Sequence, residues 1–107
     1  MVQNINYRNY LIEELKNDKE EAKEYLKAAI EEYSLDGNIE AFLLALHTVA
    51  KARGGVTNLA KESNLNRQSL YKVFNNKSKP QFETIRSVVD ALGFKITLES
   101  KTNEATV

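Results

Sequence analysis

Two short amphipathic stretches, residues 56–63 and 67–75, are separated by a turn of only three residues. In both stretches the apolar side chains recur at helical spacing: Val56, Leu59 and Ala60 in the first, and Leu70, Val73 and Phe74 in the second. The turn contains Asn64, a residue type that tolerates positive φ, and Asn66, a favoured helix N-cap. Because the small side chain of Ala60 lets two helices approach closely, the pattern predicts two helices that cross steeply through a tight turn.

The outward side of the second stretch carries residue types that contact DNA bases. Arg67 and Gln68 lie in its first turn, where Arg can donate two hydrogen bonds to guanine and Gln can pair with adenine. This combination is typical of a helix-turn-helix motif, whose second helix enters the major groove. The predicted DNA-binding residues are Thr57, Asn66, Arg67, Gln68, Ser69, Tyr71, Lys72, Asn75, Lys77 and Lys79. The alternative is an ordinary amphipathic hairpin whose polar residues only face solvent.

The charge distribution favours a nucleic-acid partner, although the chain as a whole is neutral. Its 15 Lys and Arg residues balance its 15 Asp and Glu residues. Residues 1–40 hold five basic and ten acidic residues, whereas residues 51–80 hold seven basic residues and a single acidic one, Glu62. A basic region attracts phosphate and an acidic region disfavours it. The pattern therefore indicates two surfaces with different partners, or else two solvated faces.

The chain divides into three segments. Residues 1–36 form an acidic N-terminal helical extension, residues 37–100 form the helix-turn-helix domain, and residues 101–107 form a flexible tail. The fold class that we expect is all-α, a helix-turn-helix domain of five or six helices with one short C-terminal β-strand. The predicted core contains Phe42, Leu43, Leu46, Leu59, Leu65, Leu70, Phe74, Ile85, Val89 and Leu92.

Further elements follow from apolar spacing. Residues 7–16 and 19–33 have helical stripes, the first running through Tyr7, Tyr10, Leu11 and Leu15. Residues 39–53 have a broad apolar face, typical of a central helix. Phe94 to Leu98 alternate apolar and polar residues, which predicts the strand. Because a lone strand is not stable, we expect it to pair with a twofold-related copy of itself.

The composition excludes several kinds of site. Without Cys there is no disulfide, thiolate zinc site or Cys nucleophile. The single histidine, His47, has no second His or Cys nearby, which is more typical of a packed or surface residue than of a metal ligand. We find no glycine-rich phosphate loop, no nucleophile beside a base, no signal peptide and no apolar run of the ~20 residues that span a bilayer. We therefore expect a cytoplasmic protein that is not an enzyme, needs no cofactor and does not bind membranes.

From about Ile39 to Leu98 the chain resembles the lambda-repressor (Xre) class of helix-turn-helix domains, and within it the HigA-type antidotes of addiction modules. The segments that carry the resemblance are Tyr25-Leu26-Lys27-Ala28-Ala29, Ala45-Leu46-His47-Thr48-Val49-Ala50-Lys51-Ala52-Arg53-Gly54-Gly55, Ser69-Leu70-Tyr71-Lys72, Pro80 with Phe82-Glu83-Thr84-Ile85, and Ala91-Leu92-Gly93-Phe94. The departures are mild: Asn64 stands where Gly is usual and Asn66 where Ser is usual. The residues before Pro80 are also more basic than is typical.

The resemblance implies an antitoxin. Such a protein neutralises a RelE/ParE-type toxin and represses its own operon as a homodimer on an inverted-repeat operator in double-stranded DNA. Because these toxins are typically basic, the acidic helix is expected to bind the toxin through Tyr25, Leu26 and Tyr33. A stand-alone phage or plasmid repressor without a toxin, or a pure protein-interaction module, is the alternative.

Three roles stay open for residues 1–36: toxin binding, dimerisation or bracing of the core. We predict that deleting them leaves DNA binding largely intact while toxin neutralisation fails. If they brace the core, deleting them unfolds the protein, since a helical apolar stripe usually packs against the rest of a fold.

Overall fold

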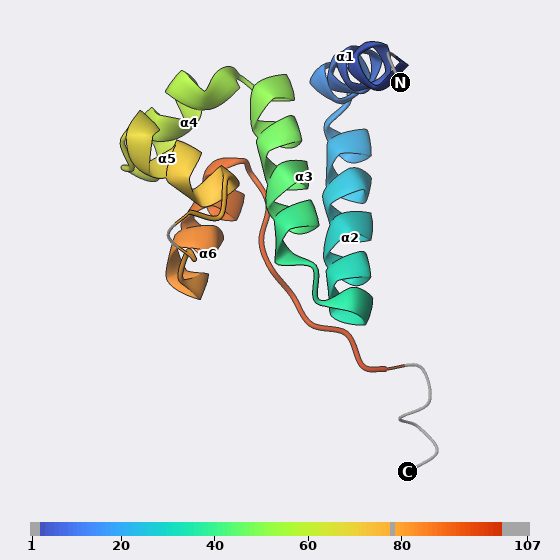
Figure 1. Ribbon diagram of the computed structural model, residues 1–107, viewed down its shortest axis with the longest axis vertical. Helices are drawn as coiled ribbons and strands as arrows, with labels where there is room; N and C mark the ends of the chain where they lie inside the picture. Colours follow the sequence, from blue (N-terminus) through green and yellow to red (C-terminus); the bar gives the residue numbers. More distant parts are fainter. Residues whose placement is uncertain (1–2, 78, 102–107) are drawn as a thin grey trace.

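In the computed structural model, which describes residues 3–77 and 79–101 and the side chains of residues 7–77 and 79–101, the chain forms six helices (Figure 1). Their bounds are α1 Gln3–Lys16, α2 Lys19–Asp36, α3 Ile39–Ala52, α4 Gly55–Ser63, α5 Arg67–Phe74 and α6 Phe82–Ala91. Helices α2 and α3 lie side by side, α1 crosses one end of this pair, and α4 to α6 gather on the other side of α3. The predicted helical class is confirmed.

The helices begin and end at residues that suit those positions. Asp18 is the N-cap of α2, and its Oδ1 accepts hydrogen bonds from two backbone N–H groups of the first turn, at 3.0 and 3.1 Å. Gly37 ends α2 with a φ of 68°. The Oδ1 of Asn38 then accepts from the N–H of Ala41 at 3.1 Å and caps α3. These caps separate α1, α2 and α3, and α2 continues to Asp36, three residues beyond the predicted stripe.

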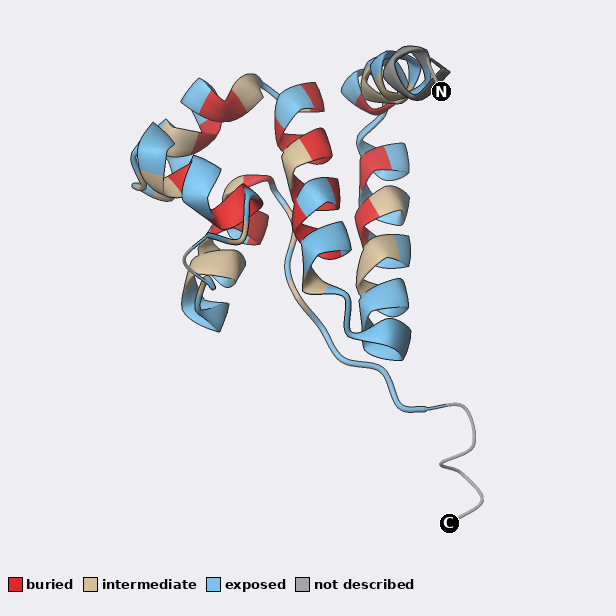
Figure 2. Ribbon diagram, viewed as in Figure 1, coloured by how far each residue is buried: buried red, intermediate tan, exposed pale blue. Residues whose placement is uncertain are grey.

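Helix α3 lies at the centre of the molecule. Leu43, Leu46 and Val49 are fully buried, and Figure 2 shows buried residues on the sides of α3 that face its neighbours. Helices α1, α2, α4 and α5 all contact α3. Eight of the ten predicted core residues are buried, and Leu65 and Ile85 are half-buried against the core.

The two N-terminal helices share this core. Leu15 of α1 and Ala22 and Leu26 of α2 are buried in the same cluster as the apolar residues of α3 to α6. This packing favours the bracing role for residues 1–36, because the core of the remaining helices is incomplete without them.

The predicted inner face of α1 is wrong for its two tyrosines and right for Leu11 and Leu15. Tyr7 and Tyr10 are 63% and 62% exposed, whereas Leu15 is buried and Leu11 and Ile12 pack against the core. The helix also begins four residues earlier than predicted, at Gln3. Aliphatic residues at positions 11, 12 and 15 form a helical face of their own, and they take the inner side because burying a tyrosine also requires a partner for its hydroxyl.

The predicted C-terminal strand is also wrong, because the described residues 3–77 and 79–101 contain no strand. After α6, the N–H of Phe94 donates to the carbonyl oxygen of Val89 at 3.1 Å around Gly93, whose φ is 95°. The chain then runs back along α3 towards α2 (Figure 1). Phe94 and Ile96 pack on the helical core, so their alternation with polar residues reflects packing against helices rather than pairing with a strand.

Contacts to α2 hold this C-terminal segment in place. The Nζ of Lys19 lies 5.8 Å from the centre of the Phe94 ring, and the Nζ of Lys27 lies 3.9 Å from a carboxylate oxygen of Glu99. The predicted tail begins with Lys101, which is exposed; residues 102–107 lie outside the described part of the chain.

Candidate nucleic-acid interface

Helices α4 and α5 are joined by residues 64–66, and both turn residues adopt the conformations predicted from the sequence. Asn64 has φ 63° and ψ 24°, a left-handed conformation that ends α4. Asn66 caps α5, since its Oδ1 accepts a hydrogen bond from the N–H of Ser69 at 2.7 Å. The two asparagines therefore fix where α5 begins and how its first turn is oriented.

Helix α5 has one buried and one exposed side. Leu70, Val73 and Phe74 are buried in the core. The structure places the predicted DNA-binding residues as follows: Thr57, Asn66, Arg67, Gln68, Tyr71, Lys72, Asn75, Lys77 and Lys79 are exposed, and Ser69 is half-buried. The buried side anchors the helix, so its polar side is held on a rigid support.

A Schellman motif ends α5 and fixes the basic loop that follows it. Asn76 has a φ of 56°, and its N–H donates to the carbonyl oxygen of Val73 at 3.0 Å. The N–H of Lys77 donates to the carbonyl oxygen of Lys72, also at 3.0 Å. Lys77 is therefore held close to the last turn of α5, and Lys79 is exposed further along the chain.

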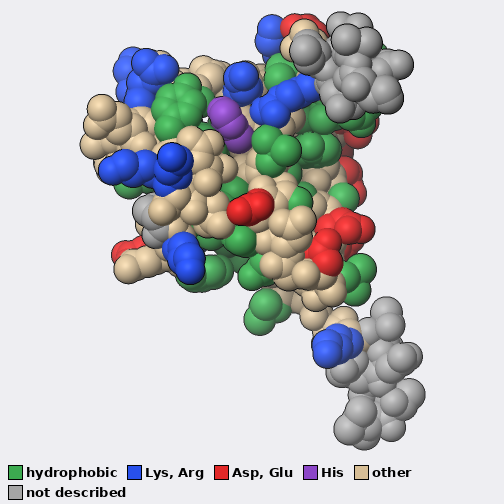
Figure 3. Space-filling model, in the orientation of Figure 1, with side chains coloured by type: hydrophobic (Ala, Val, Ile, Leu, Met, Phe, Trp, Pro, Cys, Tyr) green, Lys and Arg blue, Asp and Glu red, His purple; other side chains and the backbone are tan. Residues whose placement is uncertain are grey.

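The basic side chains of this region are not neutralised by ion pairs. Among the described side chains, the ion pairs use only Lys16, Lys23 and Lys27 as cations. Six of the seven basic residues between 51 and 80 are exposed, and Arg53 is half-buried. Figure 3 shows Lys and Arg side chains over α4 and α5 and the adjoining ends of α1 and α3, while most of the Asp and Glu side chains on this face lie towards α2. The charge separation of the sequence is thus also a separation in space.

Helix α5 has aromatic contacts with His47, a residue that the sequence analysis did not assign to this site. The His47 ring stacks flat on the Phe74 ring, with centroids 4.5 Å apart and planes 4° apart. The same imidazole meets the Tyr71 ring edge-on at 5.9 Å. Tyr71 in turn lies 5.8 Å from the guanidinium carbon of Arg67. A lone histidine in an apolar helix gave no signal of this contact, because periodicity does not show which neighbouring helix it meets.

The charge state of His47 follows from its surroundings. Burial lowers the pKa of the imidazole below its ordinary value of 6.5, and the nearby cations Lys51 and Arg8 lower it further. Its Nε2 atom is buried and has no hydrogen-bond partner among the described residues. His47 is therefore neutral at pH 7.

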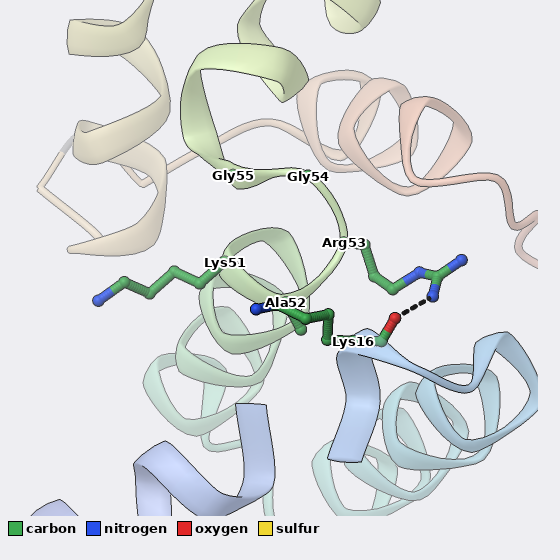
Figure 4. A pocket seen from close by; sticks show the side chains of 6 residues that line it. All are labelled: Lys16, Lys51, Ala52, Arg53, Gly54 and Gly55. Carbon is green, nitrogen blue, oxygen red and sulfur yellow. Dashed lines mark hydrogen bonds between the residues drawn. The ribbon is translucent and has the colours of Figure 1, made fainter. Parts of the chain in front are cut away.

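An open hollow of about 570 Å³ lies where α1, α3 and α4 meet. It is lined by Lys16, Lys51, Ala52, Arg53, Gly54 and Gly55 (Figure 4). Nη1 of Arg53 donates to the carbonyl oxygen of Lys16 at 3.0 Å, and the side chain of Lys51 points away from Arg53. Arg53 therefore caps the end of α1, and the cations of this hollow do not converge on a common point.

A family model described as a probable addiction module antidote protein matches residues 6–100. The chain belongs to this antidote family. An uncharacterized protein from Haemophilus influenzae is 28% identical to this chain over 92 residues, which cover 86% of this chain and 90% of the relative. No solved structure matches the chain. Family membership implies a toxin partner of some kind and suggests a non-enzymatic regulatory role.

The acidic side of the antidote protein has a shallow hollow of about 300 Å³ between α2 and α3. Its lining includes Tyr25, Tyr33, Glu32 and Asp36. Tyr25 is half-buried, and Tyr33 is partly exposed with its ring 6.3 Å from that of Phe42. The structure thus brings two of the three predicted partner-binding residues together at one surface.

Leu26, the third predicted partner-binding residue, does not belong to this surface. It is only 8% exposed and lies in the core beside Leu15 and Ala22. Tyr25, Leu26 and Tyr33 all follow the same helical period on α2. The sequence alone therefore does not show which of them are buried and which are accessible.

No group of three or more residues suited to holding a metal ion occurs within the part of the antidote protein that the structure describes. In that same part, no helix is long and apolar enough to cross a membrane.

Proposed function

We propose that this antidote protein neutralises a RelE/ParE-type toxin and represses its own operon by binding DNA through α4 and α5, a helix-turn-helix of the Xre class and HigA type. One observation carries the DNA half of the proposal: α5 is anchored by three buried residues while its other side is polar, basic and unpaired in the described chain. The family match supports the toxin half.

In this proposal the residues of the DNA-binding set contact different parts of the DNA. Arg67 and Gln68, in the first turn, contact guanine and adenine in the major groove. Lys72, Lys77 and Lys79 lie further along and bind phosphate, which supplies affinity without sequence preference. The remaining residues of the set, Thr57, Asn66, Ser69, Tyr71 and Asn75, contact the backbone or the groove wall.

We also propose that the protein binds DNA as a homodimer. One recognition helix reads only a few base pairs, so two copies on an inverted repeat, with half-sites ~10 base pairs apart, give the specificity that a genome demands. The strand-pairing interface expected from the sequence has no strand to support it. The start of α6 is the better interface, because Phe82 is 67% exposed there and Ile85, one turn on, is half-buried.

The toxin is proposed to bind the acidic side of the molecule. Tyr25 and Tyr33 offer aromatic anchors in the hollow between α2 and α3, and Glu32 and Asp36 give it negative charge. A basic toxin is complementary to such a surface, which steers the encounter and discourages binding to the basic DNA face. A stand-alone repressor would need no such surface, and the family match favours the antidote.

The DNA half is tested by comparing two kinds of alanine variant. Arg67→Ala or Gln68→Ala is expected to lose ~1–3 kcal/mol on the operator and to relax sequence preference, because each removes a bidentate base contact. Lys77→Ala or Lys79→Ala is expected to weaken binding to all sequences and to flatten the salt slope by about 0.9 per phosphate contact. Fluorescence anisotropy on operator and random duplexes, at several salt concentrations, measures both effects.

Lys23→Ala is the matched control for these variants, because it removes an exposed cation from α2 on the acidic side. Its affinities for both duplexes should stay at the wild-type values. Equal losses on operator and random DNA for Arg67→Ala would contradict a base-reading role.

The toxin half is tested at Tyr33. With the toxin encoded beside the gene, Tyr33→Ala is expected to weaken the complex at least about tenfold, since aromatic anchors dominate interface energies. Tyr10→Ala removes a more exposed tyrosine, from α1, and should leave toxin affinity unchanged. Calorimetry with purified toxin measures the affinity, and growth of toxin-expressing cells reports neutralisation. Equal toxin affinity of Tyr33→Ala and wild type would refute this surface, and the lack of a toxin gene would favour the stand-alone repressor.

A further inference from the structure

His47 links the helix at the centre of the fold to the exposed side of α5. It lies on α3, and its imidazole is packed between two aromatic rings of α5, flat on Phe74 and edge-on to Tyr71. Phe74 is buried and fixed by the core, whereas Tyr71 is exposed and belongs to the proposed DNA-binding set. The imidazole therefore joins a rigid ring to a ring at the proposed DNA surface.

Arg67 continues this chain of contacts. Its guanidinium carbon lies 5.8 Å from the centre of the Tyr71 ring, within the range of a cation–π interaction. Arg67 forms no ion pair with a described carboxylate, so this ring is the contact the structure gives its charged end. The direction of the guanidinium thus depends on where Tyr71 is held.

We propose that His47 is a positioning residue for the DNA-reading surface: its neutral ring, fixed on Phe74, holds Tyr71 and, through Tyr71, sets the direction of Arg67. The proposal rests on the proposed function for its effect on DNA, but the contact itself can be tested without DNA. Packing alone would favour Phe at this position, because the buried Nε2 of His47 has no partner among the described residues.

The charge of the imidazole decides whether this arrangement holds. Cations face it from two helices, Lys51 on its own helix α3 and Arg8 on α1, and the titratable phenol of Tyr71 faces it from α5. Protonation would add a positive charge among these cations and place it on a buried nitrogen without a partner. Since the lowered pKa favours the neutral ring, the arrangement is complete above about pH 6.5 and is lost as the pH falls through that lowered pKa.

Three substitutions separate positioning from simple packing. His47→Ala removes the ring, His47→Leu keeps most of the volume without a ring, and His47→Phe keeps the ring without a proton. We expect the preference for operator over random DNA to fall about threefold to tenfold in the Ala and Leu variants, the scale of one or two aromatic contacts. His47→Phe should restore the preference. Leu44→Ala, on the same helix and 50% exposed, is the matched control.

The pH dependence gives a second readout. In wild type the preference for operator DNA should be constant above about pH 6.5 and should decline as the pH falls through the lowered pKa of His47. In His47→Phe it should not decline there, because the chain contains no other histidine. Two results would overturn the proposal. One is that His47→Phe loses as much of the preference as His47→Ala does. The other is that the preference is unchanged in both His47→Ala and His47→Leu. If His47→Ala does not fold, His47→Leu decides.

A measurement without DNA keeps the two proposals apart. Ring-proton NMR signals of Tyr71 should shift as His47 titrates, with a midpoint below 6.5, and should not titrate in His47→Phe. If Tyr71 does not respond to the titration, His47 does not position it. If Tyr71 responds but the wild-type protein shows no preference for any duplex, the DNA-binding function fails while the contact stands.

Discussion

Deleting residues 1–36 is expected to unfold the protein rather than to release a DNA-binding fragment. The deletion removes Leu15, Ala22 and Leu26 from the core and uncovers the side of α3 that packs against α1 and α2. Each fully buried Leu is worth ~1.5–3 kcal/mol, and a domain of this size is stable by only ~5–15 kcal/mol. Exposing the facing residues of α3 adds to the loss, so the folded state is no longer favoured.

Circular dichroism during heating is the direct measurement. The truncated chain should show a weak helical signal without a cooperative transition, and it should bind operator and random DNA alike. Tyr7→Ala and Tyr10→Ala, which alter only exposed side chains of α1, should melt as the wild type does. A truncated chain that melts cooperatively and keeps its operator preference would establish residues 1–36 as a separate module.

Leu46→Ala is expected to be among the most destabilising point substitutions, at ~2–5 kcal/mol. Leu46 is 0% exposed at the middle of α3, where the helices around it leave no room for the chain to relax into the cavity. Leu44→Ala, two residues away on the same helix and half exposed, should change the free energy of unfolding by only about 0.5 kcal/mol.

Urea denaturation followed by circular dichroism measures both variants with the same probe. The difference between them isolates burial, because the two substitutions change the same side chain in the same helix. Similar free energies of unfolding for Leu46→Ala and Leu44→Ala would mean that α3 is not the centre of the core.

Features set by local chemistry could be predicted from the sequence. The cap at Asn66 and the left-handed turn at Asn64 depend on a few neighbouring residues, and the structure has both. The buried side of α5 also follows directly from helical spacing, because no other face of that helix is apolar. Arg67, Gln68, Tyr71 and Lys72 are exposed on the opposite face of α5 for the same reason.

Features that depend on a distant partner could not be predicted in this way. Alternation at residues 94–98 fits both a strand and an extended segment lying on helices, and only the position of α2 decides between them. Leu26 and Tyr33 follow the same stripe, yet the neighbouring helix covers only the first. The contact of His47 with Tyr71 joins residues 24 positions apart and leaves no periodic signal.

Helix α3 also links the acidic side of the protein to its basic side. Phe42 of α3 contacts Tyr33 on the acidic side, and His47 of the same helix contacts Tyr71 on the basic side. One straight element with no hinge between these contacts works as a rigid spacer. A toxin on one side and a duplex on the other would be held at a fixed separation and angle, so the half-site spacing of an operator would also set the distance between two bound toxins.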